Sequence, residues 1–210
     1  MSLQEIKTYL DSRSPEQLIH LFSQKIDQID REIEHLKTLK QIMHEKVEMT
    51  KRAILLIGDE IELKQMEAEY FMISPELDQF NHREFFDHLS EFMKREDFNS
   101  YTTWDSVGVM IDPQRLAKKE YLDYTHFYSR IEDVTQAQTV FLKPKGLYLV
   151  AYHRGSYDTT YQTYDRMIEF AKQNNLEFLG YSYEEFILDE ISVIGYDNYL
   201  TQIQIQVQLK

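Results

Sequence analysis

The stretch that decides the fold closes the chain and reads Tyr199-Leu-Thr-Gln-Ile-Gln-Ile-Gln-Val-Gln-Leu209. Apolar or β-branched residues alternate with glutamine at a period of two, which predicts a strand with one buried and one wetted face. Strands of this kind are typical of antiparallel sheets. The end of the chain is therefore expected to lie in an antiparallel sheet.

The sequence that leads to this strand contains an internal repeat. Two segments align without a gap when the chain is shifted against itself so that Tyr70 matches Tyr148. The same offset also matches Asp87 with Asp165, Glu91-Phe92 with Glu169-Phe170, Lys94 with Lys172, and Tyr121-Leu122 with Tyr199-Leu200. Scattered identities alone are weak evidence, but the expected elements also match. The repeat therefore predicts a duplicated unit.

Each half is expected to hold one strand, one amphipathic helix and two further strands. The strands are expected at 61–73, 107–111 and 121–131, and again at 140–152, 178–188 and 199–209. The helices carry apolar faces of Phe85, Phe86, Leu89, Phe92 and Met93, and of Tyr161, Tyr164, Ile168 and Ala171. We expect an α+β domain of two β-α-β-β repeats, about 60–131 and 138–209, with antiparallel sheets and a ligand-binding cleft between the repeats.

A long helix is expected before this domain. Its apolar stripe comprises Leu18, Phe22, Ile26, Ile29, Ile33 and Leu36, which follow one another at spacings of 4, 4, 3, 4 and 3 residues. Met43 and Val47 continue the stripe. This pattern favours a two-chain coiled coil over 15–57, with packing on the chain's own domain as the alternative. Residues 1–14 are expected to form a shorter helix that ends before Pro15, and the boundary of the domain that follows the long helix, 58–210, is placed at Gly58.

Composition excludes several classes of protein. With 23 Lys and Arg against 36 Asp and Glu, the net charge is −13, which argues against a nucleic-acid surface on this stretch. No cysteine is present, so disulfides and thiol chemistry are excluded. The seven histidines lack metal-ligand spacing, and neither a phosphate-binding loop nor a hydrolase elbow occurs. We therefore expect no metal and no cofactor, and the chain has no apolar run long enough to span a membrane.

Several motifs resemble a known family. The helical part resembles the region that follows the winged-helix domain in MerR-family transcription regulators, and the second half resembles their gyrase-inhibitor-like effector-binding domain. The stretches are Ser2-Leu-Gln-Glu-Ile-Lys-Thr-Tyr-Leu-Asp, Ser14-Pro-Glu-Gln-Leu, Ile29-Asp-Arg-Glu-Ile-Glu-His-Leu, Lys145-Gly-Leu-Tyr-Leu-Val-Ala-Tyr-His-Arg-Gly-Ser-Tyr, Gly180-Tyr-Ser-Tyr-Glu-Glu-Phe-Ile-Leu-Asp-Glu and Tyr199-Leu-Thr-Gln-Ile-Gln-Ile-Gln-Val.

The resemblance implies the dimerisation and multidrug-sensing part of a cytoplasmic transcription regulator, whose DNA-binding domain would precede Ser2. The implied partners are a second copy of the chain, paired through the coiled-coil helix as a homodimer, and a small aromatic or cationic effector. DNA would be bound only through the domain that is absent here, and no membrane is involved. The short segment before Pro15 is then expected to be the remnant helix that follows that domain.

Two adjacent carboxylates are candidates for recognising the effector. Strand alternation places Glu184 with Phe186 and Glu185 with Tyr183, so periodicity alone leaves the choice between them open. The resemblance implies Glu184, because multidrug-sensing relatives place an acid at this position. A carboxylate in a tyrosine-lined cleft resists ionisation unless a cation approaches, which suits a lipophilic cationic effector.

Aromatic residues around the matching motifs are the other candidate ligand-binding residues. Each could instead be an ordinary core aromatic. The resemblance implies pocket positions near Tyr152 and Tyr199; the remaining candidates are Tyr148, Tyr157, Tyr161, Phe186 and Trp104. Arg154 lies in the region that lines the pocket in relatives, and if it neutralised Glu184, anionic or zwitterionic ligands would become plausible.

Two other functions stay open. Stand-alone relatives of this domain include small-molecule hydrolases, in which a buried Glu could act as a general acid or base. A protein-binding module that inhibits another enzyme is the second alternative. The coiled coil favours the regulator, because a free-standing enzyme would not need that helix. We therefore expect no catalytic activity.

Overall fold

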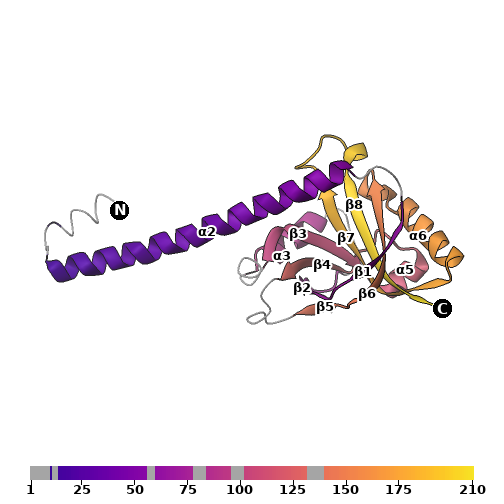
Figure 1. The fold of residues 1–210 in the computed structure, drawn as a ribbon, viewed down its shortest axis with the longest axis horizontal. Helices are drawn as coiled ribbons and strands as arrows, with labels where there is room; N and C mark the ends of the chain where they lie inside the picture. The colour runs from indigo at the N-terminus through magenta and orange to yellow at the C-terminus, as the bar shows by residue number, and fades with distance from the viewer. Residues whose placement is uncertain (1–9, 11–13, 56–59, 78–83, 96–101, 132–139) are drawn as a thin grey trace. The chain divides into compact units, whose positions relative to one another are not determined.

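The structure, a computed structural model, describes residues 10, 14–55, 60–77, 84–95, 102–131 and 140–210. It divides into two units, Met1–Glu45 and Lys46–Lys210, and each is considered by itself. The short helix expected over 1–14 and the boundary expected at Gly58 lie almost wholly outside the described residues. Figure 1 shows the long helix and the sheet-containing body.

Helix α2 spans Pro15–Leu55. Pro15 takes its first position, where a missing amide hydrogen has no cost, and the Ser14 hydroxyl accepts a hydrogen bond from the Gln17 amide at 3.2 Å. The apolar stripe is solvent-exposed in this single chain, with Ile29 54% and Leu36 57% exposed. An exposed stripe of this length on a helix is what a coiled coil would cover.

The second unit is built around one eight-stranded sheet in the order β1-β6-β8-β7-β3-β4-β2-β5, with antiparallel neighbours. The strands are β1 (Glu62–Met66), β2 (Glu69–Ile73), β3 (Thr102–Ile111), β4 (His126–Ile131), β5 (Phe141–Lys143), β6 (Gly146–Arg154), β7 (Leu176–Leu188) and β8 (Leu200–Leu209). The helices are α3 (Phe85–Met93), α5 (Pro113–Lys118) and α6 (Tyr161–Gln173), with single turns at Tyr157–Thr159 and Tyr196–Asn198.

The duplication is visible in this order. The offset that places Tyr70 on Tyr148 relates β1 to β5, β2 to β6, α3 to α6, β3 to β7 and β4 to β8. Exchanging each strand for its equivalent turns the strand order into its own reverse, as a twofold relation between two repeats requires. The prediction of an α+β fold with a long helix and duplicated antiparallel strands is confirmed.

Four expected strands had wrong boundaries, and one of them, expected at 107–111, begins at Thr102. The strands predicted at 61–73 and 140–152 are each two strands, interrupted at Glu67-Ala68 and at Pro144-Lys145. Pro144 has no amide hydrogen for a ladder bond, so it ends β5. The strand predicted at 121–131 begins only at His126, because a turn at Tyr121-Leu122 follows α5. Asp112 starts α5 by accepting hydrogen bonds from the Gln114 and Arg115 amides.

The same two interruptions show that the sheet is curled. At each interruption the chain passes between two strands that are six positions apart in the order of the sheet, and in a flat sheet these strands would lie about 29 Å apart. The steps from Met66 to Glu69 and from Lys143 to Gly146 can cover only about 11 Å. The two ends of the sheet must therefore approach one another, and Figure 1 shows β1, β2, β5 and β6 gathered in the lower part of the body.

Curling gives the sheet two distinct faces. One face, here called the helix face, carries Val109, Leu149, Ile203 and Ile205 and packs against α6. The other, called the inner face, carries a separate buried cluster of Phe71, Met110, Tyr128, Tyr148, Val150 and Tyr183. Because successive residues of a strand point to opposite faces, adjacent residues of β7 can serve two different sites.

Candidate functional site

Glu184 lies in the middle of β7, opposite Val109 of β3 and Ile203 of β8. Both neighbours belong to the helix-face core, so Glu184 points to that face, and its side chain is fully buried. Glu185 lies opposite Gly108 and Gln202 and points to the inner face. Of the two candidate carboxylates, Glu184 is thus the one enclosed in the core.

Phenols surround the Glu184 carboxylate. The Tyr164 hydroxyl donates to Oε1 at 2.7 Å and lies 2.7 Å from the Ser182 hydroxyl, and the Tyr124 hydroxyl also hydrogen bonds to the carboxylate. The other oxygen, Oε2, is buried and has no hydrogen-bond partner in the described part of the chain. Burial raises the pKa of Glu184 to about 7, against the opposing effect of the two phenols. The carboxylate is therefore poised to ionise near neutral pH.

The tyrosines that touch Glu184 were not among the predicted site residues. Tyr164 comes from α6 and Tyr124 from the turn before β4, and both are buried. Tyr121 stacks flat on Tyr164, with ring centroids 4.5 Å apart and planes 4° apart. The sequence signal for Tyr164 was its place on the apolar side of the helix, which any core aromatic shares.

Three predicted residues form an aromatic cluster on the helix face beside Glu184. Phe186 follows Glu184 on the same face of β7, and the Tyr157 ring lies 4.9 Å from it. Tyr157 also lies 5.1 Å from Tyr199, which meets the Tyr196 ring at 5.3 Å. This chain of four rings leads from the strand of the buried carboxylate toward Tyr196, which is 67% exposed.

The other predicted aromatics do not join this cluster. Tyr148 and Tyr152 point to the inner face, where the Tyr148 hydroxyl donates to the Pro144 carbonyl at 2.7 Å and the Tyr152 hydroxyl accepts from Gln202 at 2.7 Å. Tyr161 is half-exposed at the start of α6. Trp104 lies in β3, but its side chain is outside the described part. Arg154, at the end of β6, is exposed.

The backbone at Glu184 is supported from the inner face. The Tyr128 hydroxyl donates to the Glu184 carbonyl at 3.3 Å across Gly108. A Cβ at Gly108 would overlap both that carbonyl oxygen and the Tyr128 ring, so only glycine allows this approach. The position of the carboxylate is thus fixed by groups on both faces of the sheet.

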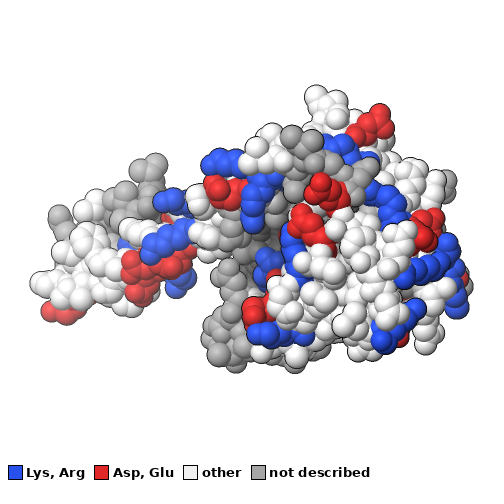
Figure 2. All heavy atoms as spheres, turned by 45° about the vertical axis from the view of Figure 1, so that its right-hand side comes forward, with Lys and Arg blue, Asp and Glu red and all other residues white. Residues whose placement is uncertain are grey.

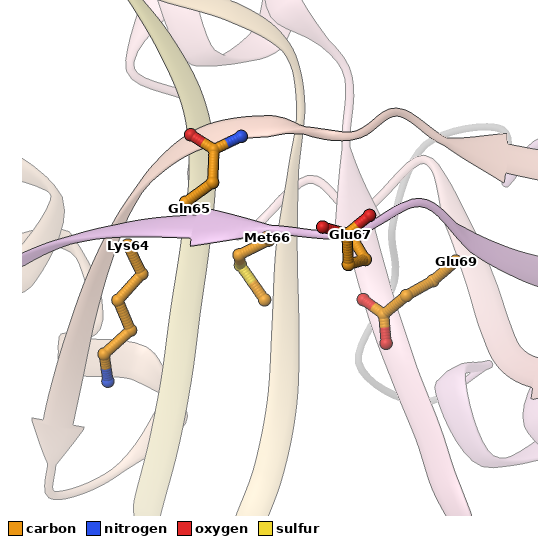
Figure 3. Close-up of a pocket in the computed structure, with 5 residues that line it drawn as sticks. All are labelled: Lys64, Gln65, Met66, Glu67 and Glu69. Atoms are coloured by element: carbon orange, nitrogen blue, oxygen red, sulfur yellow. The ribbon is translucent and has the colours of Figure 1, made fainter.

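A hollow lies at the connection between β1 and β2, away from Glu184. It has a volume of about 410 Å³ and is lined by Lys64, Gln65, Met66, Glu67 and Glu69 (Figure 3). Figure 2 shows Lys and Arg side chains interspersed with Asp and Glu over one face of this body. Among the described residues, no cluster of His, Asp and Glu could hold a metal ion, and no helix could cross a membrane.

The profile of the GyrI-like small molecule binding domain matches residues 59–208. The chain belongs to this family. This GyrI-like chain is 29% identical over 206 residues to the multidrug-efflux transporter 2 regulator of Bacillus subtilis (strain 168). The alignment covers 98% of this chain and 75% of the relative. The resemblance to the gyrase-inhibitor-like effector-binding domain is confirmed.

Solved structures give the same fold. The EcmrR–DNA complex matches with a TM-score of 0.59 and 14% identity, covering 100% of this chain and 78% of that one. The EcmrR C-terminal domain also matches with a TM-score of 0.59, at 15% identity, covering 73% of this chain and 100% of that one. The first alignment therefore includes the helical part as well as the GyrI-like domain.

Proposed function

We propose that this chain is the ligand-sensing and dimerisation part of a cytoplasmic transcription regulator, which binds a small aromatic cation at Glu184. The observation that carries the proposal is a fully buried carboxylate with one unpartnered oxygen among the described residues, set among phenol rings. A buried acid without a cation is costly, and a cationic ligand would supply what is missing. The family assignment and the regulator relative support the same reading.

The aromatic cluster suits a flat or bulky cation. At 4 Å and an effective dielectric of 20, one unit charge interacts with the carboxylate by about 4 kcal/mol. Each ring that faces the cation adds about 0.5–2 kcal/mol and demands no single ligand shape. Because Glu184 is fully buried, a ligand reaches it only when the side chains over the helix face move apart. This movement would carry the signal out of the site.

The end of α2 offers a route for that signal. Within the second unit, Met49 and Ala53 pack against Ile187 and Leu188, at the end of the strand that carries Glu184, and against Leu200 at the start of β8. Lys46 of α2 pairs with Asp189 at 3.4 Å, directly after that strand. Rearrangement around Glu184 would therefore reach the helix that we propose to be the dimer seam. DNA would be bound by a different domain of the parent regulator.

The effector claim is tested with two ligands of the same shape and opposite charge, tetraphenylphosphonium and tetraphenylborate. Wild-type protein is expected to bind the cation at least about 100-fold more tightly, because burying an anion beside Glu184 adds repulsion to desolvation. Equilibrium fluorescence or calorimetric titration measures both affinities. Equal affinity for the two ions would contradict the proposal.

The dimer claim is tested on the exposed stripe of α2. Wild-type protein is expected to sediment as a dimer, and Ile29→Lys as a monomer at the same concentration, because a charged side chain in the seam must be desolvated. Gln28→Lys introduces the same charge beside the stripe and is expected to stay dimeric. Sedimentation equilibrium distinguishes the forms, and a dimeric Ile29→Lys protein would contradict the coiled coil.

A further inference from the structure

A lysine ammonium is buried on the inner face of the sheet, opposite to the proposed effector site. Lys143 ends β5 and is only 1% exposed. Its Nζ lies 2.5 Å from a carboxylate oxygen of Glu69 and 2.5 Å from the amide oxygen of Gln204. The proposed effector site does not use any of these three residues.

Aromatic faces lie around this ammonium, and a second cation, the Arg130 guanidinium, lies 2.9 Å from the other carboxylate oxygen of Glu69. Nζ lies 5.9 Å from the ring centroid of Phe71, 5.1 Å from that of Tyr148 and 5.2 Å from that of Tyr183. Rings at such distances attract a cation through their π faces, most strongly when water is excluded. One carboxylate, one amide oxygen and three rings are the arrangement by which proteins recognise free ammonium ligands. Here we call it the ammonium box.

The ammonium box adjoins a hollow. The hollow between β1 and β2 shares the Glu69 side chain with the box, and Met66, which also lines the hollow, packs against the inner-face cluster. Figure 3 shows Met66 and Glu69 on the same side of this segment, with Gln65 on the other. An incoming cation could thus reach the Glu69 carboxylate from the hollow without crossing the sheet.

We propose that the ammonium box is a second cation site, specific for primary alkylammonium groups, and that Lys143 occupies it as a built-in ligand. Tyr183 of the box and Glu184 are successive residues of β7 on opposite faces, so the two sites are separate. An ion pair with Glu69, which Arg130 also makes at 2.9 Å, would need neither the rings nor the amide. The three rings and the Gln204 amide instead match the ammonium group itself. A free alkylammonium should therefore bind when the lysine side chain is shortened.

The test is rescue of Lys143→Ala by n-propylammonium, which supplies the missing three carbons and the ammonium. At a concentration about tenfold above half-saturation, the melting temperature of this variant is expected to rise by about 3 °C or more. 1-Propanol has the same number of heavy atoms but no charge, and it is expected to give no saturable rise. Wild-type protein, whose box is full, should respond to neither compound.

One further variant decides between a cation site and a filled void. Lys143→Ala combined with Glu69→Gln is expected to lose the response to n-propylammonium. Equal stabilisation of Lys143→Ala by 1-propanol, or no response to either compound, would overturn the proposal. If Lys143→Ala does not fold alone, the yield of folded protein on refolding with each compound is measured instead; recovery with n-propylammonium only supports the box, and no difference overturns it. Tetraphenylphosphonium binding is followed in parallel, because its loss would concern the Glu184 site.

Discussion

Glu184→Gln is expected to weaken tetraphenylphosphonium binding by about 100- to 1,000-fold. The substitution keeps the size and polarity of the side chain but removes the charge, and the lost attraction of about 4 kcal/mol at 4 Å corresponds to about 1,000-fold at most. The glutamine amide can still bond to the phenols of Tyr164 and Tyr124, so the fold around it should persist. Titration of the cation into both proteins measures the ratio.

Glu185→Gln is the matched control. It makes the same change one residue along β7, on the inner face, and should leave the affinity within about threefold of wild type, because a charge behind the sheet is further from the ligand. The account would be wrong if Glu184→Gln bound the cation as tightly as wild type. It would equally be wrong if the two substitutions had the same effect, since net charge alone would then explain it.

The stability of the ligand-free protein is expected to fall as pH rises from 5 to 8, and the substitution Glu184→Gln should remove this loss. The pKa of Glu184 is about 7 in the folded protein, against an ordinary value of 4.5. Between these values the unfolded chain releases its proton while the folded protein keeps it, so ionisation favours unfolding. The stabilising contribution of the protonated acid is complete below pH 4.5 and is lost as pH passes through 7.

The expected loss is about 2–3 kcal/mol of the free energy of unfolding between pH 5 and pH 8. Urea unfolding measures the free energy of unfolding of wild type and of Glu184→Gln at both pH values. The change between pH 5 and pH 8 in wild type minus the change in the variant isolates Glu184, because the contributions of the other titrating groups cancel. A difference near zero would mean that Glu184 has an ordinary pKa when folded. A difference of opposite sign would mean that it is held ionised by a cationic group.

The duplicated architecture was predictable because it depends on features that repeat along the chain. The alternation over 199–209 and the constant offset between the two halves are visible in one sequence, and both correspond to strands and helices of the structure. What periodicity missed is local. Pro144 divides one expected strand in two, and Asp112 caps a short helix, α5, that periodicity did not predict.

The surroundings of Glu184 were less predictable, since they depend on how distant elements pack. Tyr124 and Tyr164 are far apart in the sequence, on a turn and on a helix, and only packing on the helix face brings their hydroxyls to one carboxylate. Tyr148 and Tyr152 are in the matching motif, yet strand alternation turns both to the inner face, where Tyr148 faces Lys143. Assigning these faces required knowing which residues of β6 and β8 are paired.

The central claim is that ionised Glu184 recognises a cation inside the helix face. The most direct test is the affinity of wild type and Glu184→Gln for tetraphenylphosphonium at pH 6 and at pH 8, because this cation does not titrate. With a pKa of about 7, wild type should bind about tenfold more tightly at pH 8, and Glu184→Gln should bind weakly and equally at both. Affinity that is independent of pH in wild type, or that rises equally in Glu184→Gln, would contradict the claim.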